Sequence, residues 1–486
     1  MAATGKAGQA GASQHAYLDV DQRRDIGAAA RAKVPPGSHE GWTPPPGREP
    51  VTLLEEQDKS RDPDLVPVRH SRMQASPLTF YRGTAKIMAA DLESTPRSGL
   101  EVQLCGDAHL SNFGLFASPE RTLVFDVNDF DETLPGPFEY DVQRMAASFT
   151  IAARNNGFSP AQARSITADS LAAYRTAMAR FAGLSTMDVW YARLSENDLA
   201  KGIAAAAASL ASTKKNAKKA KRALKTAKKT RANAHQRDSL QAMSKLAEVA
   251  DGRHRLVSQP PIVVPARDLA GMYGISAADL HRVISDQFAQ YLGTLQADRR
   301  DLLERFQLID MARKVVGVGS VGTRAFIALF AGRDAGDPLF LQVKEATESV
   351  LEDHLPSQFA HPGERVVQGQ RKMQASSDIF LGWSTGAQPG YYYYWRQLRD
   401  MKGSIAVEAM IPEGLSFYAG ICGWTLARAH ARSGDPVAIA AYLGGDSEFE
   451  HAIADFCARY ADQNELDFQE FTEAIRSGRL AVSQEA

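Results

Sequence analysis

Cysteine is scarce in this chain, which has only Cys105, Cys422 and Cys457 among 486 residues. The three lie far apart and form no CxxC pair, so the sequence excludes a disulfide-based scaffold and argues against a zinc site. Net charge is also nearly absent, because 56 basic residues stand against 57 acidic ones, for a formal net charge of -1 at pH 7. The whole molecule therefore carries no field that would draw it to nucleic acid or to a membrane, and any basic surface must be local.

A targeting segment is lacking too. Residues 1–15 are mostly Ala, Gly and Gln with one Lys, so they contain neither the apolar core of a signal peptide nor a membrane-spanning helix. We therefore expect a cytoplasmic protein with no membrane partner. With 44% apolar residues, the chain is long enough for two or three lobes that each have a core.

What the sequence does contain is a set of acidic and amide residues typical of phosphoryl transfer. Residues 105–112 follow a strand expected at 100–104 and place the carboxylate of Asp107 five positions before the carboxamide of Asn112. In phosphoryl transfer a carboxylate orients the attacking hydroxyl and accepts its proton, while an amide oxygen helps to hold Mg²⁺. We therefore predict Asp107 as the catalytic carboxylate and Asn112 as a metal ligand.

A β-hairpin is expected next, with strands at 113–117 and 122–127 joined by a turn at 118–121. It leads into a run of oxygen donors, Asp-Val-Asn-Asp-Phe-Asp-Glu, at 126–132. A second metal ligand is expected among them. The position at the end of the second strand favours Asp126, whereas the Asp-Phe-Asp triplet favours Asp129. We prefer Asp129 and keep Asp126 as the alternative.

The segment GDAHLSNFG, followed by a hairpin and DFD, resembles the catalytic loop and metal-binding aspartate of aminoglycoside and choline phosphotransferases in the protein-kinase-like superfamily. The resemblance implies catalytic roles for Asp107 and His109 and a metal-ligating role for Asn112. It also implies ATP and Mg²⁺ as cofactors. Cys105 departs from the pattern, because those families have a histidine there that anchors the loop.

A glycine-rich segment much later in the chain is typical of a nucleotide-binding loop. Gly317, Gly319 and Ser320 lie within a strand-like run at 315–321, and Gly322 follows it, before another expected strand at 325–331. Missing side chains would let backbone N–H groups approach phosphates. The other interpretation is that these glycines provide the positive φ of a tight hairpin.

A lysine and a glutamate complete the expected nucleotide-binding site. Lys344 ends the next expected strand, at 339–343, where a kinase-like protein has the lysine that pairs with nucleotide phosphates. Glu364 begins a helix expected at 363–375 and would pair with Lys344. Glu345 and Glu348 are the alternatives for that pairing. Further strands are expected at 378–383 and 391–398.

In this chain the expected catalytic loop precedes the expected nucleotide-binding lobe, which is the reverse of the order in ordinary kinases. We therefore predict an α+β, protein-kinase-like two-lobe fold that is circularly permuted, with a small antiparallel-sheet nucleotide lobe and a larger helical lobe. The stretch from about residue 65 to 435, with RMQASPLTFYRG, NDFDETLPGPFEYD and RQLRDMKGS, resembles the bacterial family called domain of unknown function 2252. That resemblance leaves the substrate open.

Five segments are expected along the chain. They are a flexible N-terminal arm at 1–50, the catalytic loop, metal hairpin and first helices at 51–185, a helical insertion at 186–306, a nucleotide-binding sheet lobe at 307–404, and C-terminal helices at 405–486. The insertion includes an alanine-rich tract with ten lysines and arginines between Lys214 and Arg231, predicted to be an exposed helix or helical hairpin. Its charges would attract nucleic acid or an acidic partner at low salt, or would only solvate the helix.

Other basic residues lie closer to the catalytic strand. Arg72, Arg82 and Lys86 flank Phe80 and Tyr81. They would face a phosphate or would solvate a helix face, and the sequence leaves both interpretations open.

The leading hypothesis is an ATP- and Mg²⁺-dependent phosphotransferase that acts on an unidentified hydroxyl acceptor, a small molecule or a protein, with Asp107 as base. Transfer of AMP by the same fold stays open. The alternative is a catalytically silent nucleotide-sensing or nucleic-acid-binding module that uses the basic tract at 214–231. The retention of Asp107, Asn112 and an aspartate after the hairpin favours the enzyme.

Overall fold

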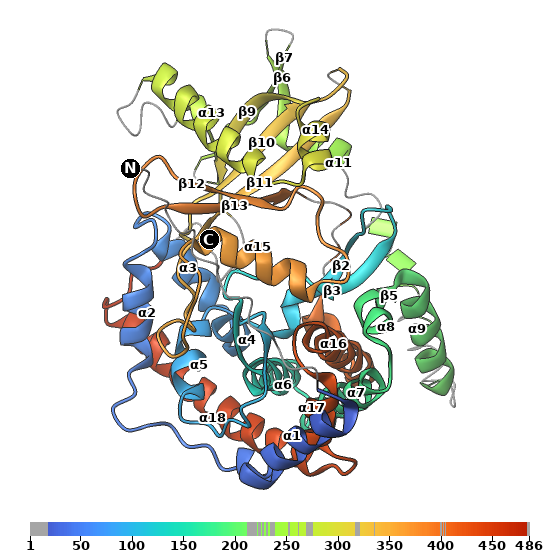
Figure 1. Ribbon diagram of the computed structural model, residues 1–486. Helices are drawn as coiled ribbons and strands as arrows, with labels where there is room; N and C mark the ends of the chain where they lie inside the picture. Colours follow the sequence, from blue (N-terminus) through green and yellow to red (C-terminus); the bar gives the residue numbers. More distant parts are fainter. Residues whose placement is uncertain are drawn as a thin grey trace, which may run out of the picture.

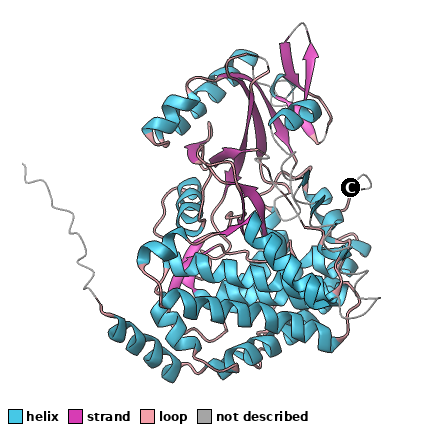
Figure 2. Ribbon diagram, turned by 90° about the vertical axis from the view of Figure 1, so that its right-hand side faces the viewer, coloured by secondary structure: helices cyan, strands magenta, loops and turns pink. Residues whose placement is uncertain are grey.

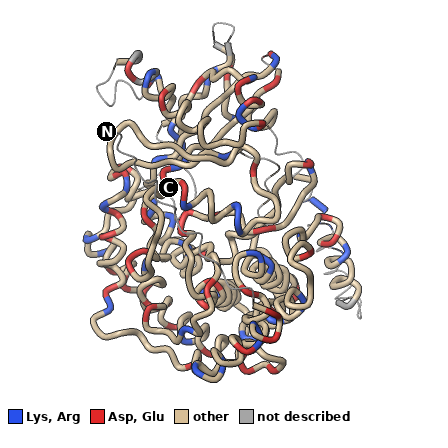
Figure 3. The backbone as a smooth tube through the Cα atoms, in the orientation of Figure 1, with Lys and Arg blue, Asp and Glu red and all other residues tan. Residues whose placement is uncertain are grey.

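The computed structural model describes residues 18–483 apart from 211–220, 222–224, 226–227, 230–231, 234–238, 251–252, 261, 269–275, 316–320, 335, 399–400, 402 and 404. Helices and strands both contribute, so the predicted α+β class is confirmed. An antiparallel sheet lies above a larger group of helices in Figure 1, with helix α15 (Pro362–Met373) between them, and Figure 2 shows the same two parts from the side. Basic and acidic residues are interspersed over both parts (Figure 3).

The sheet has six strands in the order β12-β13-β11-β10-β9-β8, and all neighbours are antiparallel. The central strand β11 is buried along its whole length, and its alternate residues face two separate cores. Phe340 packs toward α11 (Ser239–Leu246), whereas Leu341 packs toward α13 (Ala277–Gly293). The strands are β8 (Val263–Pro265), β9 (Gln307–Lys314), β10 (Ala325–Ala331), β11 (Pro338–Ala346), β12 (Gly382–Thr385) and β13 (Tyr392–Gln397).

Long helices form the lower part around one large apolar core. Every residue of α6 from 138 to 153 is buried. Gly423 of α16 lies so close to α7 that a Cβ there would come within 2.1 Å of the carbonyl oxygen of Ser170, so this helix crossing requires glycine. The helices are α6 (Phe138–Asn155), α7 (Pro160–Ala182), α16 (Pro412–Ser433), α17 (Pro436–Leu443) and α18 (Glu448–Arg476).

Residues 18–49 do not form the flexible arm that the Gly and Pro content of residues 1–50 predicts. Helix α1 (Val20–Lys33) packs on α17, where Arg31 donates to two carbonyl oxygens at 2.9 Å. Arg48 is buried and pairs with Asp91 and Asp467, each at 2.6 Å. The contacts of Arg31 and Arg48 hold residues 18–49 in place, and residues 1–17 lie outside the described residues. The next elements are η1 (Pro36–His39), α2 (Pro50–Asp58), α3 (Val66–Met73), α4 (Pro77–Tyr81) and α5 (Ala85–Leu92).

The sequence predicts a helical insertion at 186–306, but the structure adds strands to it. Strand β5 (Leu194–Ser195) pairs with the hairpin, β6 (Ala247–Ala250) pairs with β7 (Arg253–Leu256), and β8 joins the edge of the sheet. Pairing with distant strands overrides the local helix propensity there. The basic tract at 214–231 falls mostly outside the described residues, so its partner stays a prediction. The remaining helices are α8 (Thr186–Tyr191), α9 (Glu196–Leu210) and α14 (Ala297–Leu303).

Near the motifs, most elements lie where the sequence predicts them. The hairpin of β2 (Phe113–Ala117) and β3 (Leu123–Val127) is confirmed, as are β10 and α15. The strand expected at 315–321 falls mostly on residues outside the described part of the chain. The strand that pairs with β10 and precedes it is β9, with a register shift between Leu329 and Phe330. Residues 77–92 form two short helices, α4 and α5.

Candidate active site

Two pairs of strands bring the two acidic loops together. Strand β1 (Glu101–Leu104) is antiparallel to β4 (Leu134–Pro137), with Leu104 opposite Leu134. Strand β2 is antiparallel to β3, with Phe113 opposite Val127. Loop 105–112 joins β1 to β2 and loop 128–133 joins β3 to β4, so the two loops span the same gap between the two ladders. Their side chains must therefore lie close together.

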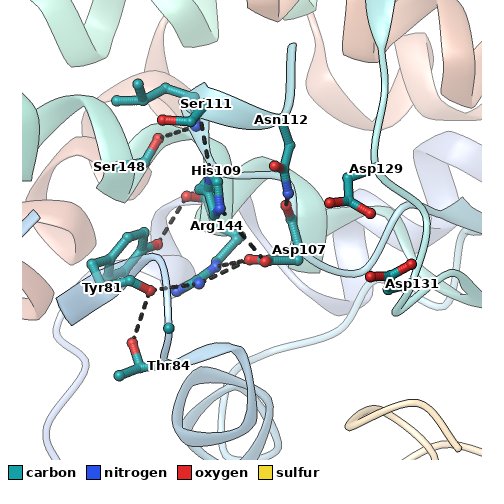
Figure 4. A network of polar contacts seen from close by, with 12 residues as sticks. Tyr81, Thr84, Asp107, His109, Ser111, Asn112, Asp129, Asp131, Arg144 and Ser148 are labelled. Atoms are coloured by element: carbon teal, nitrogen blue, oxygen red, sulfur yellow. Dashed lines mark hydrogen bonds and ion pairs between the residues drawn. The ribbon is translucent and has the colours of Figure 1, made fainter. Parts of the chain in front are cut away.

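Asp107 is held by a buried arginine. In Figure 4, Arg144 of α6 approaches Asp107 from one side, with Nε and Nη2 at 2.9 and 2.8 Å from Oδ1. The second oxygen, Oδ2, lies 3.6 Å from Nε2 of His109. The Asp107 side chain is 20% exposed and lines the cavity described below. Because Arg144 occupies Oδ1, Oδ2 is the oxygen that can accept a substrate proton.

His109 orients this carboxylate without carrying a charge near neutral pH. Burial lowers the pKa of His109 to about 4, and the nearby guanidinium groups act in the same direction against the attraction of Asp107. Its Nδ1 accepts a hydrogen bond from the backbone N–H of Ser111 at 3.2 Å. The ring proton therefore resides on Nε2, which faces Asp107.

The start of loop 105–112 is anchored by a carboxylate on α6. Oδ2 and Oδ1 of Asp141 accept hydrogen bonds from the backbone N–H groups of Cys105 and Gly106, at 2.7 and 3.0 Å. His430 lies behind Asp141, at 3.3 Å between Nε2 and Oδ2. Position 105 is a cysteine and lacks the anchoring histidine, but these two hydrogen bonds from the loop backbone to Asp141 anchor the loop instead.

Gly106 is the point where the two loops touch. Its φ is +82°, in the left-handed region, and a Cβ there would lie 2.1 Å from the carbonyl oxygen of Glu132. Burial raises the pKa of Glu132 to about 7 despite the opposing charge of Arg365. Position 106 therefore requires glycine both for its backbone conformation and for its space.

Asn112 and Asp129 share the cavity with Asp107. Nδ2 of Asn112 donates to the carbonyl oxygen of Asp107 at 2.8 Å, which leaves the amide oxygen as the ligand atom. Figure 4 shows Asp129 and Asp131 on the side of Asp107 opposite to Arg144. The structure therefore brings the predicted residues Asp107, Asn112 and Asp129 together.

Asp126, the alternative metal ligand, is not part of this site. It forms a buried ion pair with Arg428 of α16, and its oxygens also accept the backbone N–H groups of Val127 at 2.8 Å and Ala375 at 3.0 Å. Burial raises the pKa of Asp126, opposed by Arg428. Its side chain points toward α16 because alternate residues of β3 face opposite sides of the strand, a direction that counting from the turn does not reveal.

Lys344 connects the sheet to the acidic loops. Its Nζ lies 2.5 Å from Oδ2 of Asp131 and 3.9 Å from Oδ1 of Asp129. The hydroxyl of Tyr394, on β13, donates to the other oxygen of Asp131 at 2.6 Å. Burial disfavours the charge of Lys344, but the two carboxylates outweigh it and raise the pKa of Lys344 above its usual range. The predicted nucleotide lysine therefore lies beside the predicted metal loop.

The predicted pairing of Lys344 with Glu364 is wrong. The carboxylates that lie within ion-pair distance of Lys344 are those of Asp131 and Asp129, and Glu364 is half-buried in the first turn of α15. The next residue, Arg365, faces the site and donates to the carbonyl oxygens of Asp131 and Thr133 at 2.9 and 2.6 Å. The prediction was wrong by one residue in the helix phase, so that Arg365 and not Glu364 faces loop 128–133.

The glycine-rich loop is only partly described. Gly317, Gly319 and Ser320 lie outside the described residues, between β9 and β10, so their role stays a prediction. Gly322 is described: its φ is +93°, and its carbonyl oxygen accepts the N–H of Asp62 at 2.7 Å. The turn that ends the glycine-rich segment is therefore fastened to the connection between α2 and α3.

A cavity of about 890 Å³ joins these parts. It is lined from the helical part by the two acidic loops and by the turns after α2 and α4, and from the sheet by residues next to Lys344. Charged groups dominate its wall. They include Lys59, Arg61, Arg82, Lys86, Asp107, Asp129, Asp131, Glu132, Arg324, Glu345, Glu348 and Asp353.

Sequence reasoning missed several residues of this site. Asp131 is the last member of the Asp-Phe-Asp triplet, so the motif itself contained a signal for it. Arg144, Asp141 and Tyr394 stand in ordinary helix or strand patterns, and only tertiary contacts reveal them.

Among the described residues, no group of three or more His, Cys, Asp and Glu side chains forms a complete metal site. Mg²⁺ seldom needs one, because in nucleotide enzymes it uses one or two protein oxygens together with phosphates and water. Asn112 and Asp129 supply such a partial set of hard oxygen donors, so the residues fit a nucleotide-bound Mg²⁺. In the described part of the chain, no helix is long and apolar enough to cross a membrane.

The fold and the site define a mixed α and β protein with a charged cavity between an antiparallel sheet and a helical part. Residues 61–474 match the family described as an uncharacterized protein conserved in bacteria, domain of unknown function 2252, and the chain belongs to this family. Comparison with curated proteins and with solved structures finds no match.

Proposed function

We propose that this protein is an ATP- and Mg²⁺-dependent phosphotransferase with a circularly permuted, protein-kinase-like arrangement. The observation that carries the proposal is the contact of Lys344 with Asp131 of loop 128–133, a loop that lines the cavity together with Asp107 and Asn112. These groups come from segments far apart in the chain and have the charges that nucleotide binding and phosphoryl transfer require.

The order of elements supports the same proposal. The glycine-rich segment between β9 and β10 precedes β11 with Lys344, and α15 and two further strands follow. This is the order expected of a kinase-like nucleotide lobe, placed after the catalytic loop. Lys344 would bind nucleotide phosphates in place of its present contact with Asp131, and Asp129 would then be available to the metal.

Each residue has a defined part in the reaction. ATP would supply the phosphoryl group, and Mg²⁺ held by Asn112 and Asp129 would neutralise charge on its phosphates. Arg144 fixes Oδ1 of Asp107, and His109 directs Oδ2 toward the cavity. The acceptor oxygen would bond to the γ-phosphorus as the bond to ADP breaks, and the acceptor proton would pass to Oδ2. Transfer of AMP by the same residues remains the alternative within this proposal.

Thermal unfolding with Mg-ATP tests the nucleotide half of the proposal. Wild-type protein should be stabilised by millimolar Mg-ATP, and chelation of Mg²⁺ should remove most of the effect. Lys344→Met and Asp129→Asn should weaken it, whereas Lys372→Met, which changes an exposed lysine of α15 away from the cavity, should not. No stabilisation of the wild type at any Mg-ATP concentration would refute the proposal.

The catalytic half is tested by Asp107→Asn. The variant should bind Mg-ATP as the wild type does and should lose Mg-dependent consumption of ATP by about a hundredfold or more, because it keeps the shape but loses the proton acceptor. Unchanged consumption of ATP would show that Asp107 is not the base.

A further inference from the structure

The turn after α4 presents an arginine to the cavity close to Asp107. Arg82 follows the last residue of α4 and lines the cavity with Asp107, His109 and Asn112. Its charge acts on both Asp107 and His109, which places the guanidinium in their neighbourhood. No function was assigned to Arg82 by the proposed reaction.

The position of Arg82 is fixed by the same group that fixes Asp107. Nη2 of Arg144 contacts Oδ1 of Asp107 and also donates to the carbonyl oxygen of Tyr81, both at 2.8 Å (Figure 4). The hydroxyl of Thr84 donates to the same carbonyl oxygen at 2.9 Å. The Arg144 guanidinium therefore fixes the position of the turn that carries Arg82 relative to the carboxylate of Asp107.

The backbone on the other side of Arg82 is fixed as well. Nη2 of the buried Arg69 donates to the carbonyl oxygen of Gly83 at 2.8 Å. A Cβ at Gly83 would lie 2.7 Å from the sulfur of Met73, so the turn packs closely against α3. The backbone of this turn is therefore fixed on both sides of Arg82, which positions the Arg82 side chain for binding.

The guanidinium of Arg82 has no protein partner in the described part of the chain. Its Nε is buried and donates to no acceptor of the described residues, and its side chain forms no ion pair with a carboxylate of those residues. Burial lowers the pKa of Arg82, although Glu408 and Asp107 oppose this effect. Buried arginine nitrogens are ordinarily satisfied by an acceptor, so an oxyanion in the cavity is the missing partner.

Three other cations of the cavity have hydrogen-bond or ion-pair partners, although the Nε of Arg61, like that of Arg82, donates to no acceptor of the described residues. Lys86 pairs with Asp353 at 2.7 Å, Arg324 pairs with Glu345 at 3.1 Å, and Arg61 donates to the carbonyl oxygen of Val321 at 2.5 Å. Arg61 also lies below the turn that ends the glycine-rich segment, on the nucleotide side. Arg82 lies on the side of Asp107 and His109, where the acceptor must place its hydroxyl.

We propose that Arg82 binds an anionic group of the acceptor, a carboxylate or a phosphate, so that the acceptor is a hydroxyl compound with a negative charge. This inference rests on the proposed phosphotransferase function and names its substrate class. The planar fork of an arginine suits either oxyanion, and its rigid link to Asp107 through Arg144 would set the distance between the anion and the reacting hydroxyl.

Inorganic phosphate is the probe for this site. Calorimetric titration of phosphate into full-length protein saturated with Mg²⁺ and a non-hydrolysable ATP analogue should show binding. Arg82→Gln should weaken that binding by about tenfold to a hundredfold, Arg82→Lys by less, and both should leave the affinity for the nucleotide analogue unchanged. Arg333→Gln is the matched control, because Arg333 lies in the exposed turn between β10 and β11 and does not line the cavity.

The outcomes separate the two proposals. Phosphate that fails to bind, or that binds wild type and Arg82→Gln equally, overturns the anion site while nucleotide binding stands. Phosphate that binds only without the nucleotide analogue assigns Arg82 to the nucleotide phosphates and overturns the acceptor role. A wild-type protein that binds no Mg-nucleotide overturns the proposed function and this inference with it. Arg82→Lys keeps the test valid if Arg82→Gln unfolds.

Discussion

The two walls of the cavity are held in different ways. The wall to which the proposed function assigns catalysis, called the catalytic wall, is formed by loops 105–112 and 128–133 and the end of β3. It is fastened to helices by buried charges: Arg144 on Asp107, Asp141 on the loop backbone, and Arg428 on Asp126. The sheet wall, formed by β11 and its neighbours, reaches those loops through Lys344, whose partners Asp131 and Asp129 are 28% and 30% exposed.

This difference predicts which residues contribute to both folding and chemistry and which contribute mainly to binding. Groups of the catalytic wall belong to the core of the helical part, so changing them should affect folding as well as chemistry. Lys344 is a cation brought to partly exposed carboxylates, so changing it should affect binding far more than folding. Four variants test this division.

The largest effect is expected for Asp126→Ala. Removal of this carboxylate leaves Arg428 buried without its ion-pair partner, so the free energy of unfolding should fall by about 3 to 5 kcal/mol. Urea unfolding measures the loss, and Asp126→Ala combined with Arg428→Met should recover part of it. A variant that unfolds like wild type but loses Mg²⁺-dependent nucleotide binding would instead make Asp126 the metal ligand.

Glu139→Gln tests a buried acid at the start of α6. Burial raises the pKa of Glu139 to about 7 from an ordinary value of 4.5, so between these values the folded protein holds a proton that the unfolded chain has lost. The stability contribution of Glu139 is therefore complete below pH 4.5 and is lost as the pH rises through 7. The variant should gain about 3 kcal/mol relative to wild type between pH 4.5 and 8.

The measurement is urea unfolding at several pH values. The glutamine can still accept the backbone N–H of Ser98, which now bonds to Glu139 at 2.8 Å. Glu304→Gln, at an exposed position, is the control and should leave the pH dependence of stability unchanged. Parallel curves for Glu139→Gln and wild type would show that Glu139 is charged in the folded protein.

Gly106→Ala should separate the two loops of the catalytic wall. The positive φ and the approach to the carbonyl oxygen of Glu132 should together cost about 2 to 3 kcal/mol and lower the rate of phosphoryl transfer. Gly157→Ala is the matched control, since Gly157 has φ +73° but an added Cβ there meets no atom within 4 Å. Equal losses in the two variants would mean that only the backbone conformation matters.

The smallest effect on stability is expected for Lys344→Met, about 1 kcal/mol or less, because Tyr394 still donates to Asp131 and both aspartates reach solvent. Its affinity for Mg-ATP should nevertheless fall by about tenfold, as thermal shift against nucleotide concentration would show. A large loss of stability with unchanged nucleotide affinity would show that Lys344 contributes to folding, as the groups of the catalytic wall do, and not mainly to binding.

Much of the catalytic wall was predictable because its information is local. Strands at 101–104, 113–117 and 123–127 follow from alternating apolar residues and a turn, and they bring Asp107, Asn112 and Asp129 near one another. Strand β11 and helix α15 were predictable in the same way. Errors arose where a partner lies far away in the chain, as with the docked N-terminal segment and the strands of the insertion.

By itself, the sequence determined which chemical groups this protein has and which short loops carry them: Asp107, Asn112 and Asp129 on two loops, and Lys344 at a strand end. Tertiary structure alone decided that Asp126 faces Arg428, that Lys344 contacts Asp131 and that the Nε of Arg82 has no hydrogen-bond partner among the described residues. The physical reason is that helix phase, strand facing and burial set the partner of a charge, and these depend on contacts between residues distant in the sequence.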